Sequence, residues 1–305
     1  MPSTITHAYI GLDTLKRLDK KPKEIINKRI DNYQIYCQNM DVLYFYHIFL
    51  LKENSIQKVG HDFHTKNVFN YFKTMIDDNK ENKDLELFTF IAGLITHYQA
   101  DKIIHPYINF LAKNKNRIKM INKHFEIETY LDNYFTNKYQ EKNYQSIKNY
   151  LFLYNYKENE IVKKEIDKIF KIYFKCENMG YLYTKSVKEM AFVYKYLRHD
   201  KYGIKKKIYQ LIDLNPFNIR RTTYLSYHFS LNNNDYYLNT KKNSWYNYYN
   251  PSFTSNKSLL ELYEEVIDCS SNIINELYKY IFEEKKLDLK KLIGNYSYST
   301  GNSLD

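Results

Sequence analysis

The chain has 305 residues, of which 44% are hydrophobic, and 46 Lys and Arg against 35 Asp and Glu give a formal net charge of +11. It is long enough for a sizeable core, and only 7 Gly and 5 Pro argue against many short strands and for long helices. The charge favours anionic partners, either phospholipid headgroups or nucleic acid, although the solvated surface of a soluble protein is an equal interpretation.

The cysteines and the N-terminal segment exclude further classes of protein. Cys37, Cys176 and Cys269 lie far apart without a CxxC motif, so neither a zinc–thiolate site nor a disulfide framework is expected. The start, MPSTITHAYIG, lacks the basic and long apolar regions of a signal peptide, and no apolar run is long enough to span a bilayer. We therefore expect a cytoplasmic protein without a transmembrane segment.

The first predicted helix follows a histidine. Leu12, Leu15 and Leu18 recur at helical spacing, which places His7 near the start of a helix that docks on the core. A lone His at such a position usually caps a helix or packs against the core. His7 is therefore a candidate ligand only together with other metal-type residues.

A polar break at 38–41 precedes the apolar run VLYFYHIFLL. Asp41 is predicted to cap a helix that begins at Val42, and its carboxylate also faces inward beside that helix. His47 lies within the run and is interpreted as an ordinary core or boundary residue. Asp41 thus has two interpretations, a helix cap or an inward ligand.

The segment GHDFH at 60–64 comes before another amphipathic stretch, TKNVFNYFKTMI. Val68 and Phe72 are helical neighbours of His64, which places that imidazole on the buried stripe. His61 is expected to precede the helix, and Asp62 is expected to cap it. His64 is therefore the candidate ligand of this segment.

The stretch from Leu85 to Phe110 is the part around which the chain is organised. Its long apolar helical run carries His97, Asp101 and His105, each four residues after the last. A step of four rotates by only about 40°, so the three share one stripe of the helix. Such side chains are costly to bury unless something satisfies them, and a metal ion does so most simply.

Three residues in or next to this stretch are expected to shape the helix. Asp84 is a plausible N-cap, and Gly93 leaves room for a neighbouring helix one turn before the first ligand. Pro106 is expected to kink the helix or to end its regular part.

A second ligand pair follows on the next predicted helix. His124 and Glu128 are again four residues apart, with Phe125, Leu131 and Phe135 around them. Alone, such a pair is usually a surface contact.

The second half shows no comparable cluster after about residue 149. We expect one helical domain over 1–305, with a metal-binding core at 1–150 and a helical wall at 151–305. The wall includes a long loop near 232–251 around Trp245 and a strong final helix capped by Ser258. The tail from Gly294 is expected to be frayed.

Together the candidates predict a metal centre of nitrogen and oxygen donors, which suits catalytic Zn²⁺. Two zinc ions about 3.5–4 Å apart clamp a phosphate and make hydroxide at neutral pH, as phosphodiester hydrolysis requires. The candidate ligands, in chain order, are His7, Asp41, His64, His97, Asp101, His105, His124 and Glu128.

These residues sit in segments that resemble the zinc-dependent phospholipase C family, which shares an all-α fold with the P1-type nucleases. The specific part is HxxxDxxxHP followed by HxxxE, and a later W…P…SxxEL segment from Trp245 is similar more weakly. The matching segments over about 1–134 are THAY, MDVLYFY, GHDFHTKNVF, FIAGLITHYQADKIIHPYI and HFEIETYLDNYF.

The resemblance implies a distribution of ligands over two or three zinc ions. One ion would be bound by Asp41, His64, His97 and Asp101. A second ion would be bound by His105, His124 and Glu128.

The third ion would involve His7 and Asp101. Secreted members of the family complete that site with the amine and main chain of a processed Trp, which this chain lacks. The third site is therefore absent, or it is completed by Pro2 after Met removal or by water. The resemblance also makes Asp41 the base that orients the attacking water, and it implies no headgroup preference.

Four hypotheses for function remain open at this point. The first is a metallo-phospholipase C acting on phospholipid, with peripheral contact to anionic membrane. The second is a P1-type nuclease or general phosphodiesterase, which the positive charge permits. The third is an HD-type phosphohydrolase using His61 and Asp62, and the fourth is a helical protein that binds zinc without turnover.

Overall fold

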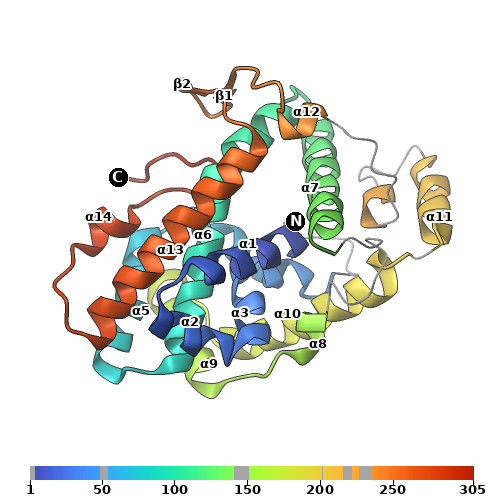
Figure 1. Cartoon of the computed structure of the whole chain (residues 1–305). Coiled ribbons are helices and arrows are strands. Elements are labelled where there is room, and N and C mark those ends of the chain that lie inside the picture. The colour runs from blue at the N-terminus through green and yellow to red at the C-terminus, as the bar shows by residue number, and fades with distance from the viewer. Residues whose placement is uncertain (1–3, 49–53, 141–150, 201, 216–221, 227–234) are drawn as a thin grey trace.

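The computed structural model describes residues 4–48, 54–140, 151–200, 202–215, 222–226 and 235–305. Over this part of the chain the protein is built of helices, with one two-stranded antiparallel sheet (Figure 1). The prediction of an all-α fold is confirmed. Within the described residues no helix is long and apolar enough to cross a membrane.

In the first half a run of short helices is followed by three longer ones. They are α1 Thr4–Arg17, α2 Lys20–Asn27, α3 Ile30–Tyr36, the 3₁₀ helix η1 Asn39–Phe45, α4 Ser55–Phe63, α5 Val68–Asn82, α6 Leu85–Ala112 and α7 Arg117–Gln140.

The second half adds helices and the hairpin. These elements are α8 Leu151–Asn155, α9 Glu160–Phe174, α10 Met179–Val193, the π-helix η3 Tyr194–Arg198, α11 Ile204–Asp213, η4 Thr223–Leu225, α12 Asp235–Leu238, β1 Trp245–Asn247, β2 Asn250–Ser255, α13 Leu259–Phe282 and α14 Leu289–Ile293.

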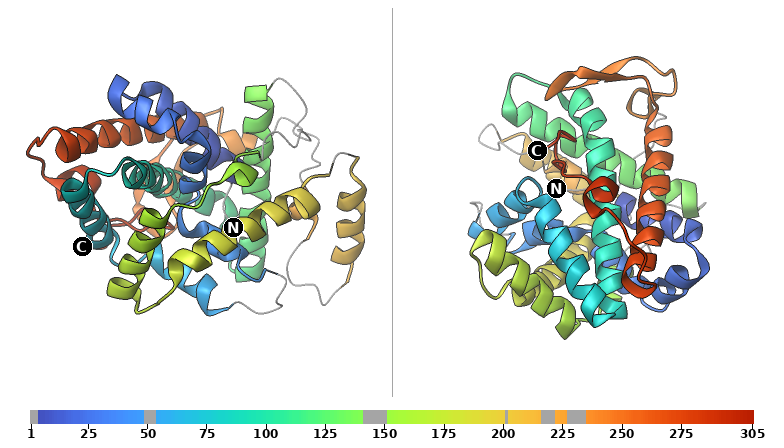
Figure 2. Two further views of the ribbon diagram at one scale, coloured as in Figure 1. Left: turned by 90° about the horizontal axis from the view of Figure 1, so that it is seen from below. Right: turned by 90° about the vertical axis from the view of Figure 1, so that its left-hand side faces the viewer.

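The long helix α6 runs through the centre of the molecule, and α13 packs along it (Figures 1 and 2). It also contacts α1, α3, α5, α7 and α9. The helix begins where predicted, because the Asp84 side chain accepts a hydrogen bond from the Leu87 N–H at 2.7 Å. A helix covered on so many sides must be apolar nearly all round, as this sequence is.

Gly93 allows α3 to approach α6 closely, as predicted. A Cβ atom at this position would lie 2.4 Å from the Tyr36 Cβ and 2.7 Å from the Tyr36 carbonyl carbon. Glycine is therefore required here for packing. The contact fixes the end of α3, and hence η1, against the middle of α6.

Pro106 does not end α6, so that alternative of the prediction is wrong. The helix continues for six further residues to Ala112. Pro106 has no N–H to donate to the Lys102 carbonyl, and the C-terminal tail packs against this carbonyl oxygen at Gly301. A Cβ on Gly301 would lie 2.7 Å from the Lys102 oxygen and 2.9 Å from the Pro106 Cγ, so only glycine fits there.

Three further local predictions are corrected. Asp41 is the third residue of η1 and does not cap a helix. The segment 60–64 ends α4, so His61 and Asp62 lie within that helix, and the next helix begins only at Val68, with Asn67 and not Asp62 at its N-cap. His47 is exposed, with a positive φ of 49°, and is not a core residue.

The C-terminal region is more ordered than expected. The expected loop at 232–251 contains α12 and most of a hairpin, in which Trp245 is buried and donates to the Lys257 carbonyl. Its first residues, 232–234, lie outside the described part of the chain. Ser258 caps α13 as predicted, in a reciprocal capping box with Glu261. The tail from Gly294 is folded back onto the body of the protein, with Tyr298 fully buried.

Candidate metal centre

All eight predicted side chains meet in one connected cluster between the helices of the first half. They come from five elements: α1 supplies His7, η1 supplies Asp41, the residue after α4 is His64, α6 supplies His97, Asp101 and His105, and α7 supplies His124 and Glu128. The i, i+4 spacing on α6 and α7 aims the ligands of each helix to one side, as the sequence predicted.

The first group, which we call the inner group, consists of Asp41, His64, His97 and Asp101. One potential ligand atom from each lies within 4.8 Å of the others, and all four side chains are buried. The His64 Nε2 is 3.2 Å from Asp41 Oδ1, and the His97 Nε2 is 3.1 Å from Asp101 Oδ2. Four donors at this mutual distance surround a space of the size of one cation.

The backbone fixes the tautomers of both inner imidazoles. The His64 Nδ1 donates to the Gly60 carbonyl at 2.7 Å, and the His97 Nδ1 donates to the Cys37 carbonyl at 3.0 Å. Each Nε2 therefore carries the lone pair and points to the centre of the group. Among the described residues neither Nε2 finds a hydrogen-bond partner, although both are buried. These orphaned nitrogens fit a bound metal ion.

The second group, the outer group, consists of His105, His124 and Glu128, whose ligand atoms also lie within 4.8 Å of one another. The His124 Nε2 is 2.9 Å from Glu128 Oε1, and the His105 Nε2 is 3.7 Å from the same oxygen. Glu128 is buried, while the two imidazoles are partly open to solvent. Asp101 lies 3.6 Å from the His105 Nδ1 and so connects the two groups.

His7 belongs to neither group but touches the inner one. Its ring stacks on His97 with centroids 4.3 Å apart, and its Nε2 lies 3.3 Å from Asp101 Oδ1. The partner suggested for a third ion, Pro2, lies outside the described residues. His7 is therefore placed beside the cluster as the resemblance implies, whereas the rest of a third site is untested.

The electrostatics keep the carboxylates ionised. Burial raises the pKa of Asp41, but the imidazoles of His64 and His97 outweigh it and leave the pKa below its ordinary value. Burial likewise raises the pKa of Asp101, and the neighbouring His105 and His97 reverse this to well below the usual range. Anionic oxygens that are already deprotonated need lose no proton to bind a cation.

Tyr298 is the contributor to the site that sequence reasoning missed. Its N–H donates to the His64 carbonyl at 3.0 Å, and its carbonyl accepts from the His105 Nδ1 at 3.1 Å. Its hydroxyl lies 2.7 Å from the Tyr71 hydroxyl and accepts from the Asn39 amide at 3.2 Å. One tail residue therefore orients a histidine of each group. The segment YSYSTG around it contains no metal-type side chain, so its sequence gave no signal.

The His-Asp doublet at 61–62 lies outside the centre. His61 is exposed and makes a hydrogen bond with the Tyr44 hydroxyl at 3.0 Å, while Asp62 pairs with Lys66. Neither residue belongs to the inner or the outer group. The structure gives no support to an HD-type site.

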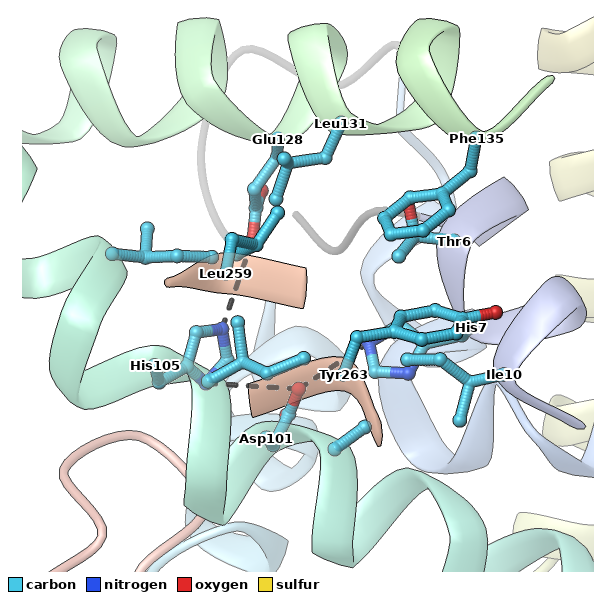
Figure 3. A pocket seen from close by; sticks show the side chains of 13 residues that line it. Thr6, His7, Ile10, Asp101, His105, Glu128, Leu131, Phe135, Leu259 and Tyr263 are labelled. Atoms are coloured by element: carbon cyan, nitrogen blue, oxygen red, sulfur yellow. Dashed lines mark ion pairs between the residues drawn. The ribbon is translucent and has the colours of Figure 1, made fainter. Parts of the chain in front are cut away.

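A pocket opens beside the cluster, between α1, α6, α7 and the start of α13 (Figure 3). Its lining includes the ionisable side chains of His7, Asp101, His105 and Glu128. Apolar and aromatic side chains lie beside them, among them Ile10, Leu131, Phe135, Leu259 and Tyr263. The pocket thus joins ionisable groups to an apolar surface.

Comparison with known proteins agrees with this geometry. The family model for zinc dependent phospholipase C matches residues 6–180, more than half of the chain, and this range contains both groups and His7. No curated protein and no solved structure matches the chain. From the extent of the family match, with two clusters of metal-type ligands inside it, the chain belongs to the zinc-dependent phospholipase C family.

Proposed function

We propose that the protein is a zinc-dependent hydrolase of phosphoric diesters, and that its substrate is a phospholipid cleaved between glycerol and phosphate. The proposal is supported chiefly by the two ligand groups, whose buried imidazole nitrogens and carboxylates are otherwise costly. Family membership supports the reaction class. The apolar side chains that line the neighbouring pocket favour a lipid over a fully polar diester.

The inner group would hold one zinc ion and the outer group a second, and His7 with Asp101 would contribute to any third. Zinc ions at such sites polarise a phosphoryl oxygen and lower the pKa of water towards neutrality. Asp41 is the residue proposed to orient the attacking water and to accept its proton. It is buried and positioned by contacts with His64 and His97, which suits a residue that orients the water.

The decisive measurement is the number of zinc ions per chain in protein purified without chelator. We expect two, or three if His7 takes part. Protein with wild-type zinc content is then assayed on phosphatidylcholine, single-stranded DNA and a generic diester. Preferential cleavage of the lipid supports the proposal, whereas preferential cleavage of DNA would instead assign a P1-type nuclease activity.

Two substitutions test metal binding and turnover. His97→Ala is expected to lose zinc and stability together, because the site and the fold are coupled. Asp41→Asn is expected to lower turnover by roughly a hundredfold or more while the protein remains folded, since a general base contributes that much. Zinc without turnover in the wild type would identify a non-catalytic zinc protein. Full activity of Asp41→Asn would remove the proposed role of this carboxylate.

A further inference from the structure

The apolar side of α11 faces solvent, whereas an ordinary surface helix turns its apolar side to the core. Its apolar side chains at 204, 208, 211 and 212 follow helical spacing and share a stripe about 100° wide. This stripe faces solvent: Ile204 is 60% exposed and Leu211 is 68% exposed, and α11 has no buried residue. With Leu214, which is 77% exposed, these residues form what we call the α11 ridge.

The polar side of α11 forms the hydrogen bonds that hold this helix to the rest of the protein. The Asp213 carboxylate accepts hydrogen bonds from the backbone and hydroxyl groups of Thr222 and Thr223, at 2.6–3.0 Å. The Tyr209 hydroxyl donates to the Leu197 carbonyl at 3.1 Å. These bonds hold the helix in an orientation that keeps its apolar stripe outside.

The exposed charges on α11 and just before it are cationic. In the described residues of 192–215, the exposed charged side chains are Lys195 and Lys207. The two acids of this stretch point inward, since Asp200 is buried and the carboxylate on α11 is bonded to the threonines. The surface is thus complementary to an anionic apolar partner.

We propose that the α11 ridge inserts into the boundary between headgroups and acyl chains of an anionic phospholipid surface, with Lys207 of the same helix against lipid phosphates. The inference rests on the proposed function, which makes phospholipid the substrate. An amphipathic helix with flanking cations binds such an interface by apolar burial and electrostatic attraction together.

The shape of the ridge favours a bilayer over a second protein. The helix stands at the edge of the molecule (Figures 1 and 2), and its ten residues extend about 15 Å. One side of a helix of this length offers much less area than the roughly 800 Å² that each partner buries in a stable protein interface. A fluid lipid surface needs no complementary groove.

The helix that carries the ridge is linked to the candidate metal centre through one short helix. The 3₁₀ helix η4 contacts both α11 and α7, and α7 carries His124 and Glu128 of the outer group. A bilayer held at α11 therefore lies one short element away from the helix that supplies these ligands. Docking there raises the local concentration of substrate near the site.

The test is flotation of the zinc-containing full chain with vesicles of phosphatidylcholine and phosphatidylserine. Leu211→Glu is expected to reduce the vesicle-bound fraction at least tenfold, because burial of the leucine is lost and a repelled charge is gained. The matched control is Ile161→Glu on α9, at a position 45% exposed, and it is expected to bind like the wild type. Circular dichroism checks that both variants are folded.

A second variant tests the electrostatic half of the proposal. Lys207→Gln is expected to weaken binding to vesicles containing phosphatidylserine about fivefold and to leave binding to pure phosphatidylcholine unchanged. Equal losses on both kinds of vesicle would overturn the assignment of this lysine to lipid phosphate.

Hydrolysis assays separate docking from catalysis. Leu211→Glu should cleave a monomeric short-chain diester at the wild-type rate but vesicular lipid more slowly. Equal vesicle binding by Leu211→Glu and the wild type would overturn the inference. The inference would also be overturned if the wild type did not bind vesicles but formed a dimer that Leu211→Glu abolishes. A wild type that floats through α11 yet hydrolyses no diester would support docking and reject the proposed function.

Discussion

Single residues of this protein orient the proposed ligands through their backbone atoms. The carbonyls of Cys37 and Gly60 fix the imidazoles of the inner group, and the carbonyl of Tyr298 fixes one of the outer group. No side-chain motif encodes these contacts, because any residue type offers a carbonyl. The ligands themselves could be predicted from their side chains, but their supports could not.

The first prediction concerns the Tyr298 hydroxyl. Tyr298→Phe removes the nearer of two partners of the Tyr71 hydroxyl, and a partner of the Asn39 amide, in a fully buried place. We expect the free energy of unfolding to fall by about 1–2 kcal/mol, the usual cost of leaving buried polar groups unpaired. Urea denaturation measures this, with Tyr296→Phe at a partly exposed position as the control. Equal stabilities would show that the hydroxyl network contributes nothing.

At the scale of elements, local periodicity predicted what lies on a regular helix and failed where geometry is set by distant contacts. The spacing of His97, Asp101 and His105 was sufficient to place them on one side of α6. The 3₁₀ geometry around Asp41 was not predictable, because η1 is shaped by packing on α4 and α10. The folded tail was missed for the same reason, since its partners lie about 200 residues earlier in the chain.

The second prediction tests the approach of α3 to α6. Gly93→Ala would place a methyl group against the Tyr36 backbone, so we expect a loss of about 2 kcal/mol or more. Gly60→Ala is the matched control, because its nearest neighbour would be a ring carbon of Tyr44 at 3.3 Å. This control should be neutral or slightly stabilised, since Ala favours a helix. Similar losses at both positions would contradict the packing argument.

The third prediction is a pH dependence at the contact of α9 with α5. Burial, and then the Asp78 carboxylate, raise the pKa of Glu165 to about 7. Because the folded state holds this proton more tightly than the unfolded chain, the stabilisation is complete below about pH 4.5 and is lost as pH rises through 7. Glu165→Gln mimics the protonated acid and should not show this loss.

The measurement is chemical denaturation of both proteins between pH 5 and pH 8. Relative to the wild type, Glu165→Gln should gain roughly 1–3 kcal/mol across this interval. The exposed Glu284→Gln removes one negative charge elsewhere and serves as the control. A difference between wild type and Glu165→Gln that is constant with pH would contradict the raised pKa.

At the scale of the whole molecule, the centre joins side chains from α1, η1, α6 and α7. The fourth prediction is therefore that chelation of zinc lowers the melting temperature, because buried carboxylates and orphaned imidazoles then face one another without a cation. Free zinc at one hundred times its dissociation constant would restore about 2.7 kcal/mol. Calorimetry with added zinc, and with magnesium as the control, measures the effect. An unchanged melting temperature in protein shown to be zinc-free would refute it.

The position of Tyr298 also dictates a temporal order during biosynthesis. Every proposed ligand is translated by residue 128, whereas the residue that orients His64 and His105 emerges on the order of ten to thirty seconds later at ordinary elongation rates. A nascent chain therefore presents its donors before their final support exists. Binding of a cation by the finished geometry would therefore follow translation, and we expect the ribosome-bound protein to select among competing ions less strictly than the released one.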